Sequence, residues 1–215
     1  MKIEWFGHSC FLLTSASGMK LLMDPFKAES YLNYPPVRAA ADIVTVSHEH
    51  NDHNYLVDIT GTPEILRGEL DKKFNGIHIK GLSAFHDDVQ GKERGINTIF
   101  CVNMDDINIC HLGDLGHVLT GGEISQIGKV DLLLIPIGGV FTIDIDQAGK
   151  IVSELKPGIT IPMHYKTERC QFLKWSSDDF IKGKKGVKKI GSSEIEIKAA
   201  DIPAEPEIII MKYPG

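Results

Sequence analysis

The prediction of the fold rests on Ser47-His-Glu-His-Asn-Asp-His-Asn54. Within six positions this segment places the imidazoles of His48, His50 and His53 together with the carboxylate of Asp52. Neutral imidazole nitrogen and carboxylate oxygen are ligands that suit zinc, manganese, nickel and iron. A packed core or an ordinary surface has little reason to gather these groups, so we interpret the segment as metal-binding.

The spacing within the segment indicates two metal positions. The preceding apolar run, 42–47, is typical of a β-strand, and side chains two residues apart leave a strand on the same side. His48 and His50 therefore point together towards one ion. Asp52 and His53 come from the turn that follows and face a second point in space.

Length, composition and charge fit a compact enzyme of one domain. The chain has 215 residues, of which 42% are hydrophobic and 24% charged, and this length can bury a substantial core. The net charge of −6 disfavours nucleic acid and anionic membranes as partners. The basic run 182–189 lacks interleaved aromatic residues, so we interpret it as a solvated surface.

The beginning of the sequence and its cysteines favour the cytoplasm. The start, Met1-Lys-Ile-Glu-Trp-Phe-Gly-His8, carries charges where a secretory signal is apolar, and no run is apolar enough to span a membrane. The four cysteines form no Cys-x-x-Cys pair. Cys10, Cys101 and Cys110 lie in apolar surroundings, which predicts buried thiols in a reducing compartment.

Strand signals dominate the first half of the chain, and helices are expected in the second half. A single α/β domain, 1–215, with sheets inside and helices outside accommodates this order. Asp146 is the candidate N-cap of the longest helix. The expected strands are 2–6, 10–14, 20–23, 42–47, 76–80 with 81–85, 98–103, 107–111, 131–137, 159–162, 187–190, 195–198 and 207–211, and the expected helices are 120–127, 146–155 and 177–182.

Other candidate ligands follow other predicted strands. His86 comes after the run 79–85, Asp114 lies in the loop after 107–111, and His164 follows 159–162. Strand ends at one rim of a sheet are where ligands from distant parts of a sequence converge. Each of these residues alone is typical of a hydrogen-bonded structural position, but together with the first cluster they complete a site for two metals.

Taken in order, these residues reproduce the ligand motifs of the metallo-β-lactamase superfamily, which the chain resembles over nearly its whole length. The resemblance implies an αββα sandwich, in which two mixed β-sheets are flanked by helices and the metals lie at one edge of the sheets. Other motifs look like the branch of small bacterial hydrolases similar to the ascorbate-6-phosphate lactonases: Gly7-His-Ser-Cys-Phe11, Met23-Asp-Pro-Phe26, Gly113-Asp-Leu-Gly116, Pro136-Ile-Gly138 and Pro162-Met-His-Tyr165.

The resemblance also divides the ligands between two divalent ions. We expect Zn²⁺, with Mn²⁺, Ni²⁺ and Fe²⁺ as alternatives, because such donor sets discriminate poorly among these ions. Each ion keeps an open position, as catalytic sites do. The implied ligands are His48, His50 and His86 for the first ion, Asp52, His53 and His164 for the second, and Asp114 as the bridge between them.

The expected function is a metal-dependent hydrolase in which activated water attacks an ester, lactone or thioester of a small anionic substrate. Asp52 is the expected catalytic residue, because it lies beside the attacking water and could move its proton. A metal-dependent phosphodiesterase is the alternative, and a non-catalytic metal-binding protein is disfavoured by the complete ligand set. The short segment between His53 and His86 lacks the long flap of antibiotic-hydrolysing members, which disfavours a β-lactamase. The sequence is compatible with a monomer and with a homo-oligomer.

Five more residues are candidates for supporting the ligands or contacting substrate. Asp24 follows a predicted strand and is expected to accept the N–H of a ligand imidazole. His8 is expected to line the pocket mouth or cap a turn, and His111 to close a strand or lie behind the ligands. His117 is assigned to the substrate or to the surface, and Tyr165 to substrate contact.

Overall fold

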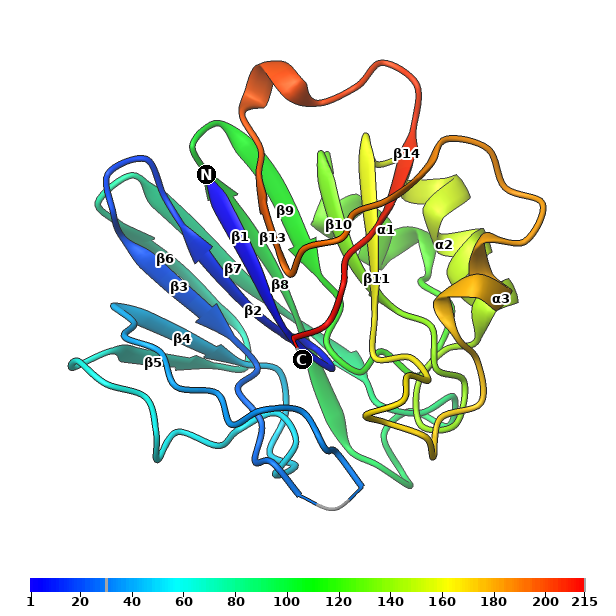
Figure 1. Cartoon of the computed structure of the whole chain (residues 1–215), viewed down its shortest axis with the longest axis horizontal. Coiled ribbons are helices and arrows are strands. Elements are labelled where there is room, and N and C mark those ends of the chain that lie inside the picture. The colour runs from blue at the N-terminus through cyan, green and yellow to red at the C-terminus, as the bar shows by residue number, and fades with distance from the viewer. Residues whose placement is uncertain (30, 215) are drawn as a thin grey trace.

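The computed structural model describes residues 1–29 and 31–214, which form two mixed β-sheets packed face to face (Figure 1). The first sheet has six strands in the order β13 (Glu194–Glu196), β1 (Lys2–Gly7), β2 (Cys10–Thr14), β3 (Lys20–Met23), β4 (Ile43–Val46) and β5 (Glu64–Arg67). The second has eight strands in the order β12 (Val187–Lys189), β14 (Glu207–Ile210), β11 (Ile159–Met163), β10 (Leu132–Pro136), β9 (Ile107–His111), β8 (Ile96–Met104), β7 (Ile77–Phe85) and β6 (Leu70–Phe74). The predicted αββα sandwich is confirmed.

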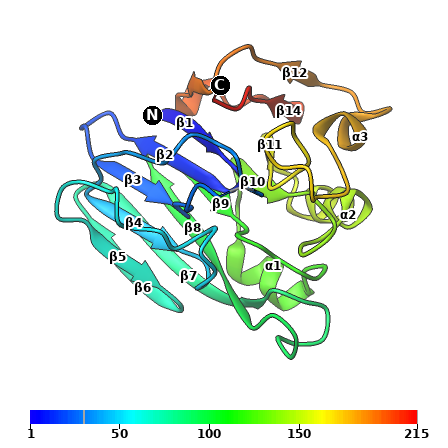
Figure 2. The same ribbon diagram turned by 60° about the horizontal axis from the view of Figure 1, so that its bottom comes forward.

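The helices lie along the second sheet, beside β10, β11 and β14 (Figure 2). They are α1 (Gly121–Ile127), α2 (Ile145–Leu155) and α3 (Ser177–Ile181), and a 3₁₀ turn, Ala199–Asp201, follows later in the chain. The main core includes residues from both sheets and from all three α-helices. All helices in the described ranges are too short or too polar to traverse a bilayer.

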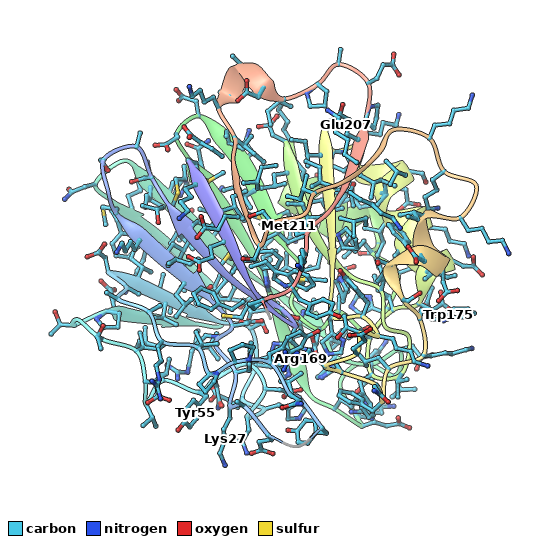
Figure 3. All side chains as sticks on the ribbon, viewed as in Figure 1. Lys27, Tyr55, Arg169, Trp175, Glu207 and Met211 are labelled. Carbon is cyan, nitrogen blue, oxygen red and sulfur yellow. The ribbon has the colours of Figure 1, made fainter. Side chains whose placement is uncertain are left out.

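The outer face of the first sheet carries a second core. Alternate residues on a strand point to opposite faces, so Leu21 and Ile43 join the main core whereas Leu22 and Val44 join the second one. The loop between β3 and β4 completes this second core with side chains such as Phe26. The loop between β3 and β4 thus covers the outer face of the first sheet. Figure 3 shows how densely side chains fill both layers.

Two expectations about local structure are corrected, and two strands were not predicted. Asp144, not Asp146, caps α2, because its carboxylate accepts the backbone N–H of Gln147 at 2.9 Å and the Gln147 Oε1 atom accepts the backbone N–H of Asp144 at 3.0 Å. Strands β5 and β6 were not predicted, since both are short edge strands with charged side chains. Cys101 is partly exposed on β8, whereas Cys10 and Cys110 are buried as expected.

The loops that carry the candidate ligands leave the carboxyl ends of strands in both sheets. The two sheets therefore bring residues that are distant in sequence to one rim of the sandwich. Three site residues adopt the left-handed backbone region that L-residues rarely occupy, which indicates local strain held by the surrounding fold. These are His8 after β1 with φ 51°, Asp24 after β3 with φ 46° and His164 after β11 with φ 47°.

Candidate metal centre

Asp114 lies at the centre of the histidine cluster. Its Oδ2 atom is 3.1 Å from Nε2 of His164, 3.2 Å from His53, 3.6 Å from His86 and 4.0 Å from His48. Two ligands of one zinc ion, each bonded at about 2.0–2.2 Å, lie about 3–4 Å apart. The separations around Asp114 are therefore those of atoms that share cations.

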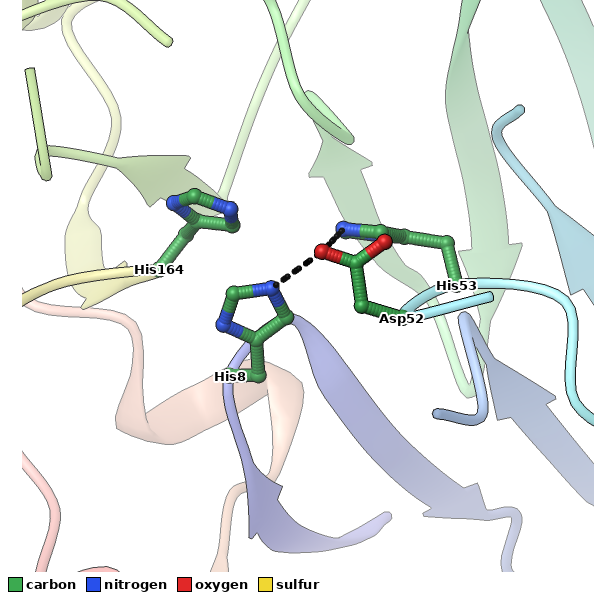
Figure 4. Close-up of side chains that lie close together, drawn as sticks. All are labelled: His8, Asp52, His53 and His164. Carbon is green, nitrogen blue, oxygen red and sulfur yellow. Dashed lines mark ion pairs between the residues drawn. The ribbon is translucent and has the colours of Figure 1, made fainter. Parts of the chain in front are cut away.

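All seven candidate ligands come together, in groups whose ligand atoms lie within 4.8 Å of one another. The group of His48, His50 and His86 matches the ligands expected for the first ion. The group that contains Asp52, His53 and His164 matches those expected for the second ion, with His8 added. Figure 4 shows His8 and His164 together on one side of the Asp52 carboxylate and the His53 ring, with the ion pair between His8 and Asp52 dashed. The groups are His48, His50 and His86; His48, His53 and Asp114; and His8, Asp52, His53 and His164.

Several buried nitrogen and oxygen atoms in this cluster have no hydrogen-bond partner in the described part of the chain. They include Nε2 of His48 and His53, both ring nitrogens of His8, and Oδ1 of Asp114. An unsatisfied buried polar atom costs about 1–3 kcal/mol, so a cluster of them around one point requires a compensating ligand. Cations held in the middle of the cluster would satisfy Nε2 of His48 and of His53 and Oδ1 of Asp114 together, so the residues present fit divalent metal ions.

Asp24 orients two of the imidazoles from behind. Its Oδ2 atom accepts the Nδ1 hydrogen of His53 at 2.9 Å and the hydroxyl of Ser47 at 2.6 Å. The Ser47 oxygen in turn lies 3.0 Å from Nδ1 of His48, which donates to it. Both histidines consequently turn Nε2 towards Asp114. Burial alone would raise the pKa of Asp24, but the hydrogen bond from His53 and the nearby His111 hold it below its ordinary value.

The charges within the cluster favour metal ligation. Burial lowers the pKa of His48 to about 3 and that of His8 to about 4, so both imidazoles are neutral at pH 7 and offer lone pairs. His53 behaves differently, because Asp114 and Asp52 raise its pKa well above the ordinary value despite its burial. A cation that binds Nε2 of His53 must therefore displace a proton.

A cavity of about 380 Å³ opens over the cluster. This volume is typical of sites for small molecules. The floor contains metal ligands, and the wall is aromatic apart from one guanidinium. The lining residues are His50, Asp52, His86 and Asp114 on the floor and Tyr31, Arg94, Phe141 and Phe172 on the wall.

Comparison with known proteins identifies the family of the chain. A family model described as "Beta-lactamase superfamily domain" matches residues 2–164. The chain belongs to this superfamily. It is 34% identical over 197 residues to a superfamily relative from Archaeoglobus fulgidus and 30% identical over 191 residues to one from Thermoplasma acidophilum, both named metal-dependent hydrolases. In each case the match covers 78% of this chain and 84% of the relative.

The fold of this superfamily member is also found in a crystal structure from Thermotoga maritima. That protein, assigned to the Zn-dependent hydrolases of the metallo-beta-lactamase superfamily, is 34% identical and superposes with a TM-score of 0.84 over 99% of both chains. The relatives support a metal-dependent hydrolase in general terms. Their names do not bear on the lactonase branch, which stays a prediction.

Of three further candidates in this superfamily member, His111 lies where it was expected, whereas His117 and Tyr165 do not line the cavity. His111 is buried behind the metal ligands, where Nε2 donates to the Ser9 carbonyl at 2.9 Å and Nδ1 accepts the Gly113 N–H at 3.1 Å. Both ring nitrogens of His117 bind backbone groups, so it is not directed at the cavity. Tyr165 is buried with its ring centroid 5.6 Å from that of Trp5, which corrects the expectation of substrate contact.

Asn97 is a supporting residue that sequence reasoning missed. It is fully buried, its Oδ1 atom accepts the Asp114 N–H at 2.9 Å, and its Nδ2 group donates to the Leu112 carbonyl at 2.9 Å. Gly113 must be a glycine here, because a Cβ atom would lie 2.3 Å from Asn97 Oδ1. The sequence feature that could have identified Asn97 is its position as a polar residue near the start of the apolar strand β8.

Proposed function

We propose that the chain is a dinuclear metal-dependent hydrolase that cleaves an ester, lactone or thioester bond of a small anionic molecule. The observation that carries this proposal is the buried carboxylate of Asp114 among four imidazoles, on the floor of a cavity large enough for such a substrate. Two divalent ions held there would polarise the scissile group and lower the pKa of water.

In this proposal Asp52 would handle the proton of the attacking water. Its side chain lines the cavity, and its Oδ2 atom lies 3.4 Å from Nε2 of His8 and 3.9 Å from Nε2 of His53. Burial opposes ionisation, but His53 and His8 hold the pKa of Asp52 well below its ordinary value. Asp52 is therefore ionised at neutral pH, and it would orient the water and shuttle its proton rather than retain it, because a carboxylate of low pKa is a weak base.

The remaining residues of the site would orient the candidate ligands, exclude water and attract the substrate. Asp24 and Ser47 hold the ring orientation of His53 and His48, so that neither imidazole must rotate during turnover. Phe141 and Phe172 give the cavity an apolar wall that displaces water from the bond to be broken. Arg94 gives the same wall one positive charge, which favours an anionic substrate and keeps a phosphodiesterase as the second candidate.

A substrate panel tests the proposal. Protein loaded with Zn²⁺, Mn²⁺ or Ni²⁺ is assayed with lactones, a thioester and bis(4-nitrophenyl) phosphate. We expect turnover of the carbonyl substrates, and Asp52→Asn should reduce kcat by about 10²–10⁴, the usual contribution of a general base. Asp146→Asn, an exposed change on α2, is the matched control.

The outcomes separate the remaining classes. Cleavage of the phosphodiester alone would replace the proposal with the second candidate. No turnover of any substrate by protein shown to contain metal would favour a non-catalytic metal-binding protein. Full turnover and both metals in Asp52→Asn would contradict the role given to Asp52.

A further inference from the structure

The wall of the cavity is a continuous row of aromatic rings that ends in a guanidinium. The Phe141 and Phe172 centroids are 5.9 Å apart, and those of Phe172 and Tyr31 are 5.8 Å apart. At the other end, the Arg94 Cζ atom lies 4.0 Å from the centroid of the Phe141 ring. Four separate loops supply these side chains, so the fold assembles the row around the mouth of the metal centre.

Stacking on Phe141 orients Arg94 without consuming its hydrogen bonds. A cation–π contact uses the face of the guanidinium, whereas its five N–H donors lie in the plane and point outwards. Within 1–29 and 31–214 the Arg94 side chain makes no salt bridge or hydrogen bond. Arg94 therefore presents a fixed, unneutralised fork of donors to the cavity. Such a fork matches the geometry of a carboxylate or phosphate group.

The loop that carries Arg94 is tied to the metal centre. His86, the metal ligand at the start of the loop, donates its backbone N–H to the Gly95 carbonyl at 3.0 Å and so closes the loop. The buried carboxylate of Asp87 fills the interior of this loop. It accepts four backbone N–H groups at 2.7–3.0 Å, those of Val89, Gly91, Glu93 and Arg94. The spacing between Arg94 and the metal ligand His86 is thereby set by the backbone.

We propose that Arg94 binds a carboxylate or phosphate at the end of the substrate remote from the bond that is broken. The substrate class is then a small molecule with a reactive carbonyl at one end and an oxyanion at the other, and its middle packs on Phe141 and Phe172. This inference rests on the proposed function for the reactive end only. Binding of the remote oxyanion is a separate property that is measured without turnover.

Calorimetric titration of the metal-loaded protein tests the inference. The ligands are succinate, glutarate and adipate, each paired with the monocarboxylate of the same carbon number, and 4-phosphonobutanoate for the phosphate-like end. We expect at least one dianion to bind about tenfold or more tightly than its monocarboxylate, the usual effect of a hydrogen bond to a charged group. A larger gain with 4-phosphonobutanoate than with glutarate would identify phosphate as the preferred end.

The variants are Arg94→Met, Arg94→Lys and Phe141→Leu, with Arg38→Met as the control, because Arg38 is exposed and outside the cavity lining. Arg94→Met should abolish the preference for the dianion, Arg94→Lys and Phe141→Leu should reduce it, and the control should retain it. Circular dichroism and metal content verify that each variant is folded and loaded.

Two results would overturn the inference: equal affinities of the wild type for every pair, or an unchanged preference in Arg94→Met. A dicarboxylate that simply bridges the two metals would give the second result. Dianion binding that depends on Arg94, in a protein that cleaves none of the carbonyl substrates, would overturn the proposed function and leave this inference standing.

Discussion

Single carboxylates determine how the imidazoles of this site present their nitrogens. Asp114 lies in front of the rings, where four Nε2 atoms converge on one of its oxygens. Asp24 lies behind them and receives the Nδ1 hydrogen of His53. Asp52 is half-buried at the edge and faces the cavity. Three aspartates of the same chemistry therefore occupy three different positions around the candidate metal centre, and we expect each to have a different role.

The first prediction at this scale concerns Asp24→Asn. The amide cannot supply the negative charge that holds the Nδ1 hydrogen of His53, so we expect metal affinity to fall by about 10–100-fold. Competition with a chromophoric chelator measures this change. Asp42→Asn is a matched control, because Asp42 is exposed and its carboxylate binds only the Lys20 backbone at the far end of β4. Equal affinities for the wild type and Asp24→Asn would contradict the role of Asp24.

The second prediction concerns His8, whose ring centroid lies 4.0 Å from that of His164 (Figure 4). We expect His8→Asn to weaken binding of the second ion about tenfold or more, while the first ion stays bound to His48, His50 and His86. Asparagine tolerates the left-handed backbone of position 8, which limits other effects. Elemental analysis after dialysis should give close to one ion per chain; two retained ions would remove His8 from the ligand set.

Gly116 shows how tightly two elements pack behind the ligands. A Cβ atom there would lie 2.3 Å from the His86 carbonyl carbon and the Asp87 nitrogen. We expect Gly116→Ala to lower the free energy of unfolding by about 1–3 kcal/mol, as overpacking does, and to displace His86 and weaken metal binding. Urea denaturation and metal titration measure these effects. Gly122→Ala, where the nearest side-chain atom is 3.8 Å away, should stabilise α1 instead.

Asp131 joins the start of β10 to the start of β9. Its Oδ2 atom accepts the backbone N–H of Asn108 at 2.9 Å and the Asn108 side-chain amide at 2.7 Å, and Lys129 lies 2.8 Å from its Oδ1 atom. Burial would raise the pKa of Asp131, but Lys129 and Asn108 together lower it below the ordinary value. The ionised carboxylate thus stabilises the junction between the strands.

We expect Asp131→Asn to lower the free energy of unfolding at pH 7 by about 1–2 kcal/mol, the usual effect of hydrogen bonds to a charged group. Because the folded pKa is depressed, this stabilisation is present above the unfolded pKa of about 3.9 and is lost as pH falls through the folded value. Urea titrations from pH 7 to pH 3 should show the difference shrinking below about pH 4. Asp178→Asn, in an exposed pair with Lys189, should change little; a pH-independent gap would contradict the assignment.

At the scale of the molecule, the ions would connect loops from both sheets. Ligands follow β4 in the first sheet and β7, β9 and β11 in the second, so metal binding couples the two halves of the sandwich. We expect chelation to lower the midpoint temperature measured by calorimetry, because a ligand at 100 times its Kd contributes about 2.7 kcal/mol. A His50→Ala, His53→Ala double variant should not respond to the chelator. An equal response in both proteins would show that the chelator acts elsewhere.

Much of the fold and of the ligand set follows from local patterns. Spacing within 47–54 indicates ligands because residues a few positions apart in a strand and turn have little freedom. Most strands and all three α-helices were predicted near their observed places, since buried strands carry apolar runs. Edge strands β5 and β6 escaped prediction because their charged side chains carry no such pattern.

The sequence alone supplied the seven candidate ligands, four of them within 48–53 and three after other predicted strands, and their order carried the resemblance that implied the superfamily and the sandwich. Tertiary packing was needed to place His8 among the candidate ligands, Asn97 and Ser47 behind them, and Arg94 on the cavity wall. Each of these contacts joins loops far apart in the chain, and no local pattern specifies how two sheets orient their rims towards each other. The left-handed backbone at His8 and His164 likewise exists only because the assembled fold holds it.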